Sequence, residues 1–231
     1  LFLEGNNLTI KATDQKISYI SEMAVEGKED GIVAVSCEKI VNVVKNLPDG
    51  IITFEEGTET LKIKPEEGLI DFTLRTTNAS DFPSLATAMD NSFTISQKDF
   101  TDMIGQVIFS VSEDDSKFSM TGALLEKNGN SLIMVATDGR RLSYINRLIN
   151  SEIPDFSSIV IPSQFLGIIR KLSVNEGDFQ VSINTNILSI AFGSCIITTT
   201  LIKNEFPAYK RVIPERQSKV CIVNKNNLSN A

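Results

Sequence analysis

Residues 135–145 read VATDGRRLSYI and follow the apolar run at 132–134. An Asp-Gly pair between such runs is typical of a hairpin turn, because glycine adopts positive φ without a Cβ clash. A weaker copy, IKATDQKISYI, occupies residues 10–20, at an offset of 136 − 12 = 124. A second pair of segments, DFP at 81–83 and EFP at 205–207, has the same offset, 205 − 81 = 124. Two pairs at one offset indicate that the chain repeats itself.

Apolar residues alternate over most of the chain and change to helical spacing in three places. Alternation predicts strands, which we expect near 1–4, 7–13, 17–25, 32–35, 51–56, 59–64, 69–75, 92–95, 117–126, 131–137, 141–147, 157–161, 178–183, 187–192 and 195–203. Helical spacing and N-cap serines predict helices over 36–47, 96–111 and 163–173.

These elements form two units, each built from two βαβββ halves, and the first unit lacks its opening strand and helix. Short connections between successive strands favour antiparallel sheets. Each helix has one apolar face, so we expect all helices on one side of the sheets, in an α+β fold.

Composition limits the function classes. The chain has 231 residues, is 42% hydrophobic and has a net charge of 22 − 29 = −7, so no bulk positive field attracts it to nucleic acid or anionic membrane. Its three cysteines, Cys37, Cys195 and Cys221, are widely spaced and suit a reducing cytosol. No apolar run is long enough for a transmembrane helix, and no signal peptide opens the chain. The start at Leu1 and the end after a strand-like run at 220–223 suggest a fragment of a longer protein.

An enzyme is one hypothesis, with Asp138 as a catalytic carboxylate beside Arg140 and Arg141. Histidine is absent, and there is no phosphate-binding glycine loop, nucleophile elbow or zinc-spaced cysteine pair. A turn aspartate with a local ion pair is the simpler interpretation, because Asp14 repeats the turn without a polar cluster. A purely structural β-rich repeat protein is a further alternative.

Basic residues lie on the expected solvent faces of the helices, and the repeat would place these faces on one side. They are Lys39, Lys45, Lys98, Arg170 and Lys171. Acidic residues concentrate in turns, such as 113–115. A basic side in an acidic protein is what non-specific binding of duplex phosphates needs.

Two segments together resemble a known family: ATDGRRL at 136–142 and FPAYKRVIP at 206–214 are similar to signature segments of the bacterial sliding clamp, the beta subunit of DNA polymerase III. LPDG at 47–50 and DFPSL at 81–85 resemble its first domain. The resemblance implies a DNA-clamp fold with sheets outside and helices inside. It further implies a first domain over 1–90 that is incomplete at its amino end, a second domain over 91–216, and the start of a third over 217–231.

The same resemblance implies function. Such clamps are cytoplasmic homodimers closed head-to-tail around duplex DNA, without catalytic activity, cofactor, metal or membrane contact. They tether the polymerase III alpha subunit, the clamp loader and other proteins through a peptide resembling Gln-Leu-x-Leu-Phe. The implied pocket positions are Met120, Thr137, Gly139, Arg140, Arg141, Leu142, Pro207, Arg211 and Val212. Arg140 is a departure, since many members have histidine there.

Overall fold

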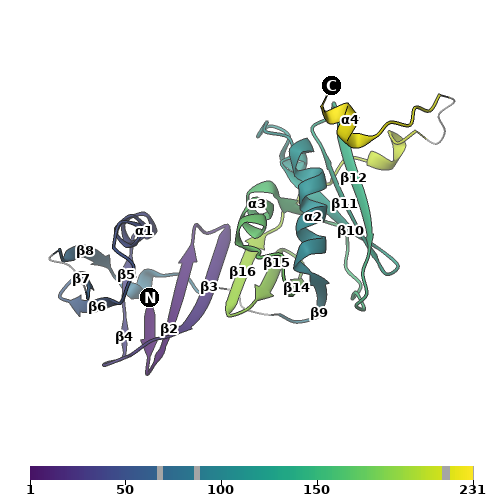
Figure 1. The fold of residues 1–231 in the computed structure, drawn as a ribbon. Coiled ribbons are helices and arrows are strands. Elements are labelled where there is room, and N and C mark those ends of the chain that lie inside the picture. Colours follow the sequence, from purple (N-terminus) through teal and green to yellow (C-terminus); the bar gives the residue numbers. More distant parts are fainter. Residues whose placement is uncertain (67–69, 86–88, 215–218, 231) are drawn as a thin grey trace.

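The computed structural model describes residues 1–66, 70–85, 89–214 and 219–230 (Figure 1). We call the elements up to η1 the first unit. They are β1 (Phe2–Glu4), β2 (Asn7–Thr13), β3 (Ile17–Ala24), β4 (Gly31–Ile32), β5 (Ala34–Val35), α1 (Cys37–Lys45), β6 (Ile52–Gly57), β7 (Thr60–Pro65), β8 (Phe72–Thr77) and the 3₁₀ helix η1 (Ala79–Asp81).

The elements from β9 to η4 form the second unit, and α4 (Lys225–Ser229) follows it. They are β9 (Ser92–Ser96), α2 (Gln97–Val107), η2 (Ile108–Ser110), η3 (Phe118–Met120), β10 (Gly122–Asn128), β11 (Ser131–Thr137), β12 (Leu142–Leu148), β13 (Ile159–Pro162), α3 (Ser163–Leu172), β14 (Asp178–Ile183), β15 (Ile187–Phe192), β16 (Cys195–Thr200) and η4 (Tyr209–Arg211).

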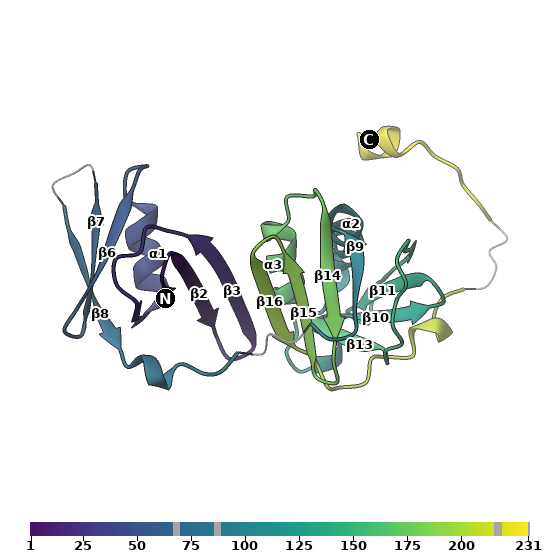
Figure 2. The ribbon, with the colours of Figure 1, turned by 90° about the horizontal axis from the view of Figure 1, so that it is seen from below.

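One sheet runs through both units. Its eight strands lie in the order β4-β1-β2-β3-β16-β15-β14-β9, and β3 pairs with β16 from Ile17–Thr199 to Ser21–Cys195. Two four-stranded sheets, β12-β11-β10-β13 and β5-β8-β7-β6, complete the fold, and the strand pairs of the described residues are antiparallel. Figures 1 and 2 show α1, α2 and α3 on one side of the eight-stranded sheet. The α+β prediction, with antiparallel sheets and helices on one face, is confirmed.

The repeat holds at the level of individual strands. Adding 124 to the bounds of β2, 7–13, gives 131–137, the bounds of β11. The predicted hairpin that follows is present in both units, as β2–β3 and β11–β12. The order of elements after these hairpins is similar. The second unit continues with β13, α3 and three strands, whereas the first has two short strands, β4 and β5, where one strand over 32–35 was expected, and then α1 and three strands.

The main core lies in the second unit, between α2, α3 and the sheets. Its fully buried side chains include Phe100, Leu125, Phe165 and Phe179. Helix α1 of the first unit has no buried residue. In the second unit α2 packs beside α3, and no helix of the described residues takes that place beside α1.

Two predicted strands and one predicted helix of the second unit have different bounds in the structure. The strand expected over 117–126 begins only at Gly122, because residues 118–120 turn as η3 and the amide of Ser112 donates to the carbonyl of Met120 at 2.8 Å. The helix expected to reach residue 111 ends at Val107 and continues as η2. The last strand ends at Thr200 rather than 203, because the amide of Ile202 turns to the carbonyl of Val160 in β13.

The strand-like run at 220–223 is not a strand. Val220 is 78% exposed and Ile222 is 93% exposed, and no strand of the described residues pairs with them. An apolar run becomes a strand only where a neighbour accepts its backbone hydrogen bonds. The strand expected near 69–75 is β8 from Phe72 onward, and residue 69 lies outside the described residues. Among the helices that the structure describes, none is long and apolar enough to span a membrane.

Candidate binding groove

The turn at 137–141, which we call the Asp138 turn, is held by its own side chains. Oδ1 of Asp138 accepts hydrogen bonds from the amides of Arg140 at 2.8 Å and Arg141 at 3.0 Å. Oγ1 of Thr137 accepts from the amide of Gly139 at 3.1 Å and donates to the carbonyl of Arg141 at 2.7 Å. Gly139 has φ of +88°, a conformation that glycine adopts without strain.

The first unit repeats these hydrogen bonds at positions 124 lower. Oδ1 of Asp14 accepts from the amides of Lys16 at 2.9 Å and Ile17 at 2.7 Å. Thr13 accepts from the amide of Gln15 at 3.0 Å and donates to the carbonyl of Ile17 at 2.9 Å. Gln15 has a positive φ of +74°, and Gly139 in the other copy also has a positive φ. This agreement supports the interpretation of Asp138 as a turn residue rather than a catalytic carboxylate.

The electrostatics of Asp138 fit that role. The amides of Arg140 and Arg141, followed by the Arg141 guanidinium, lower the pKa of Asp138 to about 2. Oδ2 of Asp138 lies 3.0 Å from Nε of Arg141 in an ion pair. Both carboxylate oxygens are therefore engaged, and the group is a weak base at neutral pH. The described residues contain no cluster of His, Cys, Asp or Glu that could hold a metal ion.

The sheet β12-β11-β10-β13 has an inner face against α2 and an outer face covered in part by residues 202–214, the connecting segment. Alternation along β11 places Leu132, Met134 and Ala136 in the inner core, and Ile133 and Val135 on the outer face. Tyr209 and Phe206 of the connecting segment pack on the outer face. The chain reaches this face because β16 ends at Thr200 and Ile202 then pairs with Val160 of β13.

Tyr209 anchors the connecting segment. It is buried, and its hydroxyl donates a 2.6 Å hydrogen bond to Oε2 of Glu126 in β10. Nζ of Lys210 lies 3.6 Å from the same oxygen. Burial, and then the hydrogen bond to the Glu126 carboxylate, raise the pKa of Tyr209 well above its usual value.

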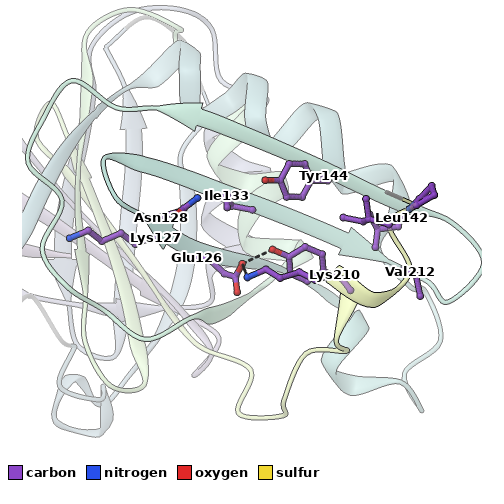
Figure 3. Close-up of a pocket in the computed structure, with 11 residues that line it drawn as sticks. Glu126, Lys127, Asn128, Ile133, Leu142, Tyr144, Lys210 and Val212 are labelled. Atoms are coloured by element: carbon purple, nitrogen blue, oxygen red, sulfur yellow. Dashed lines mark hydrogen bonds and ion pairs between the residues drawn. The ribbon is translucent and has the colours of Figure 1, made fainter. Parts of the chain in front are cut away.

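A groove of about 890 Å³ opens between the connecting segment and β12 (Figure 3). In Figure 3 Tyr144 lies on one side of the groove and Lys210 on the other, with Leu142 and Val212 near one end and Lys127 and Asn128 toward the other. We call it the binding groove. Its lining residues are Glu126, Lys127, Asn128, Ile133, Leu142, Tyr144, Tyr209, Lys210, Val212, Ile213 and Pro214.

The nine pocket positions expected from the sequence fall into three places. Leu142 and Val212 line the binding groove. Pro207 and Arg211 line a second hollow of about 440 Å³ beside the same connecting segment. The other five lie outside both hollows, on the Asp138 turn and at the end of η3: Met120, Thr137, Gly139, Arg140 and Arg141.

The Asp138 turn forms a basic, aromatic rim beyond Leu142. The guanidinium of Arg141 lies over the ring of Phe109, 5.9 Å from its centroid. Nζ of Lys117 donates a 3.1 Å hydrogen bond to the carbonyl of Asp138. Arg140 is exposed. Arg140 therefore adds a permanent positive charge to this rim.

Sequence reasoning did not assign Glu126, Ile133, Tyr144, Tyr209 or Lys210 to the site, although all line the binding groove. Alternation along β11 and β12 could have placed Ile133 and Tyr144 on one face. It does not indicate that the connecting segment crosses that face.

The basic residues of α2 and α3, Lys98, Arg170 and Lys171, lie on helices that pack on the inner face of the sheet β12-β11-β10-β13, whereas the groove lies on its outer face. Lys39, Lys45, Lys98, Arg170 and Lys171 are all exposed, on the helices that share one side of the eight-stranded sheet (Figure 2). The guanidinium of Arg170 in α3 lies beside Gly105 of α2, and a Cβ built at Gly105 would be 3.6 Å from it.

The nested repeat, the sheet shared by two units and the groove define a protein of the DNA-clamp class. Two family models match the chain: the DNA polymerase III beta subunit N-terminal domain over residues 1–86 and its central domain over residues 94–208. The chain belongs to the DNA polymerase III beta subunit family.

Individual relatives agree with this assignment. The chain is 33% identical to the beta sliding clamp of Treponema pallidum, over 100% of this chain and 62% of the relative. It is 29% identical to the Escherichia coli K12 beta sliding clamp, over 95% and 60%. A crystal structure of the DNA polymerase III subunit beta from Pseudomonas aeruginosa superposes with a TM-score of 0.85 at 26% identity, covering 93% of this chain and 60% of that one. A sliding clamp from the same organism bound to griselimycin gives 0.86 at 26% identity, covering 94% and 59%. The chain thus spans about 60% of the length of these relatives.

Proposed function

We propose that this chain is part of a processivity factor, a ring-shaped sliding clamp that encircles duplex DNA and tethers the replicative polymerase. The observation that supports this most is the placement of the basic helices α2 and α3 and of the binding groove on opposite faces of the sheet β12-β11-β10-β13. One face can follow DNA while the other holds a partner. A tether of this kind has no catalytic activity of its own.

The basic helix residues would contact phosphates without reading bases. A clamp must slide, so contacts have to be weak, sequence-independent and easily exchanged, as those of exposed lysine and arginine are. The overall charge of −7 is consistent with this role, because a topological link needs little affinity.

The partner site would combine the binding groove, the second hollow and the rim of the Asp138 turn. A short peptide resembling Gln-Leu-x-Leu-Phe would place its apolar side chains on Leu142 and Val212, with Pro207 and Arg211 beside them. Met120, Thr137, Gly139, Arg140 and Arg141 would complete the site at the turn. The partners would be the polymerase III alpha subunit, the clamp loader and other proteins with this motif.

The chain would supply three parts of the ring: most of a first domain over 1–90, a second domain over 91–216 and the start of a third over 217–231. Residues 67–69, 86–88, 215–218 and 231 in these ranges lie outside the described residues. The exposed apolar face of α1 would be covered by a first-domain helix equivalent to α2. Two copies of the whole protein would bind head-to-tail in the cytoplasm and form a closed ring. A head-to-tail interface closes in this way only when the rotations between successive copies add up to a full turn.

A peptide titration with a matched pair of variants tests the groove. Leu142 lines it, whereas Leu148 lies on the same strand, is 70% exposed and lines neither hollow. In the full-length protein, Leu142→Asp should weaken binding of a fluorescent Gln-Leu-x-Leu-Phe peptide by more than about tenfold, because a charge replaces an apolar contact. Leu148→Asp should leave the affinity close to that of the native protein.

Both variants should keep the native circular dichroism spectrum. Equal losses in the two variants, or no saturable binding by the folded native protein, would contradict the tether and leave only a structural repeat protein.

A further inference from the structure

The binding groove is longer than the pocket expected from the sequence. The two share Leu142 and Val212. The expected pocket then continues to the Asp138 turn, before β12 begins, whereas the groove runs the other way along β12. Asn128 of β10 lies at the far end of the groove. It pairs with Ser131 of β11, which in turn pairs with Leu148 of β12. Leu148 lies six positions after Leu142, so at about 3.4 Å per residue the groove extends roughly 20 Å beyond Leu142.

The extension has an apolar and aromatic lining. Ile133 lies on the outer face of β11, and Tyr144 is 45% exposed on β12. The ring centroids of Tyr144 and Tyr209 lie 6.2 Å apart, with an interplanar angle of 37°. Both tyrosines and Ile133 line the groove. Tyr144 supplies the exposed part of this pair, because Tyr209 is only 5% exposed and its hydroxyl is bonded to Glu126. An exposed tyrosine ring held in place by a buried one is a rigid surface of the kind that peptides bind.

The charged side chains of the extension already have partners. Glu126 accepts from Tyr209 and lies near Lys210. Nζ of Lys127 lies 2.7 Å from Asp155 and donates a 2.5 Å hydrogen bond to the carbonyl of Ile153. A ligand would therefore find an apolar surface here rather than a charge that needs neutralising.

We propose that the binding groove takes a peptide longer than the five-residue motif, with an apolar flank that lies along β12 on Ile133, Tyr144 and Tyr209. This proposal rests on the proposed function and deepens it, since it specifies the partner. The occupant is the continuation of the same peptide, because one uninterrupted groove connects Leu142 and Val212 with the tyrosine pair.

The spacing sets the pattern of the flank. Leu142 and Tyr144 both face outward and lie about 7 Å apart along β12. An extended peptide advances about 7 Å in two residues. Apolar side chains at every second position of the flank would therefore meet the groove, and the positions between them would face solvent.

Five fluorescent peptides test this in the full-length protein. One is the Gln-Leu-x-Leu-Phe pentapeptide. Two carry six added residues, alternately Val and Ser, at the amino or the carboxyl end. The last two carry six alternating Gly and Ser residues at the same ends, as controls for length. We expect one of the Val-Ser peptides to bind about tenfold more tightly than the pentapeptide, because its valines are buried on the groove. The matching Gly-Ser peptide should gain less than about twofold.

Variants locate the gain. In Tyr144→Ser the ratio of the two affinities, extended over short, should fall to about 1, because the tyrosine surface is lost. Val174→Ser is the control, since Val174 is 73% exposed and lines neither hollow. In that variant the ratio should stay at its native value.

The outcomes separate the two proposals. If the pentapeptide binds but neither set of added Val-Ser residues increases the affinity, the proposal of a longer peptide is wrong and the tether stands. Coverage of the groove by another part of the protein would give this same result. A gain that survives Tyr144→Ser also overturns the extension. If the pentapeptide itself does not bind, the proposed function fails.

Discussion

The hydroxyl of Tyr209 donates a 2.6 Å hydrogen bond to Glu126 and so fixes the connecting segment across β10. This contact joins residues 83 positions apart in the chain. One wall of the binding groove depends on it, because Lys210 and Val212 lie one and three positions after Tyr209. We therefore expect stability and partner binding to be coupled at this pair.

Removing the hydroxyl should weaken both properties. Tyr209→Phe deletes the donor to a carboxylate, and hydrogen bonds to charged groups contribute about 1.5–3 kcal/mol. We expect the free energy of unfolding in urea to fall by about 1–2 kcal/mol, because Lys210 remains near Glu126. Tyr144→Phe is the matched control, since no hydrogen bond of its hydroxyl is seen in the described part of the chain. It should change stability by less than about 0.5 kcal/mol, and equal losses in both variants would refute the role of Tyr209.

The same hydrogen bond predicts a dependence on alkaline pH. The folded state raises the pKa of Tyr209 and so favours its protonated form. The stabilisation should be fully present below the unfolded pKa of about 10 and should decline as pH rises through the folded value. The difference in unfolding free energy between the native protein and Tyr209→Phe should therefore be constant from about pH 8 to 10 and shrink above it. A difference that grows above pH 10 would contradict this assignment.

The Asp138 turn predicts the opposite sign, at acidic pH. Amides of Arg140 and Arg141 lower the pKa of Asp138 to about 2. The charged carboxylate should therefore stabilise the fold above its unfolded pKa of about 3.9, and this contribution should vanish as pH falls toward 2. Asp138→Asn should melt at a lower temperature than the native protein at pH 7, and the gap should close between about pH 4 and 2. A gap that is the same at pH 7 and pH 2 would show that the charge is not responsible.

Basic residues of α2 and α3 should control the salt dependence of DNA binding. Each neutralised phosphate contributes about 0.9 to the slope of log K against log salt on duplex DNA. Replacing Lys98, Arg170 and Lys171 by serine should lower the slope by about 0.9 for each phosphate that is no longer neutralised. Lys210→Ser, on the outer face, is the control and should leave the slope unchanged. Fluorescence anisotropy with duplex DNA over a range of salt concentrations checks this, and identical slopes for all proteins would contradict the assignment of the DNA-facing side.

Local sequence signals predicted the elements and the repeat because they depend on neighbours in the chain. The hairpin at Asp138 and its copy at Asp14 need only a few residues to form, and their hydrogen bonds agree pair by pair. The run at 220–223 was predicted wrongly because a strand also requires a partner, which alternation does not reveal.

The binding groove depends on tertiary contacts and was only partly predictable. Leu142 and Val212 were assigned through the resemblance, whereas Tyr144 and Glu126 join the site only because the connecting segment crosses their face. The first unit shows why the repeat alone is not enough. At 124 positions below Ile133, Val135 and Leu142 it has Thr9, Lys11 and Ser18, so the same backbone presents a polar face.

The most direct test of the central claim is retention on circular DNA. The full-length protein, placed on a nicked circular plasmid by the clamp loader of the same organism, should elute with the DNA in gel filtration at high salt. Cutting the plasmid once should release it, because a ring that holds DNA by topology slides off an end. Retention that is equal on circular and linear DNA, or absent from both, would contradict the account.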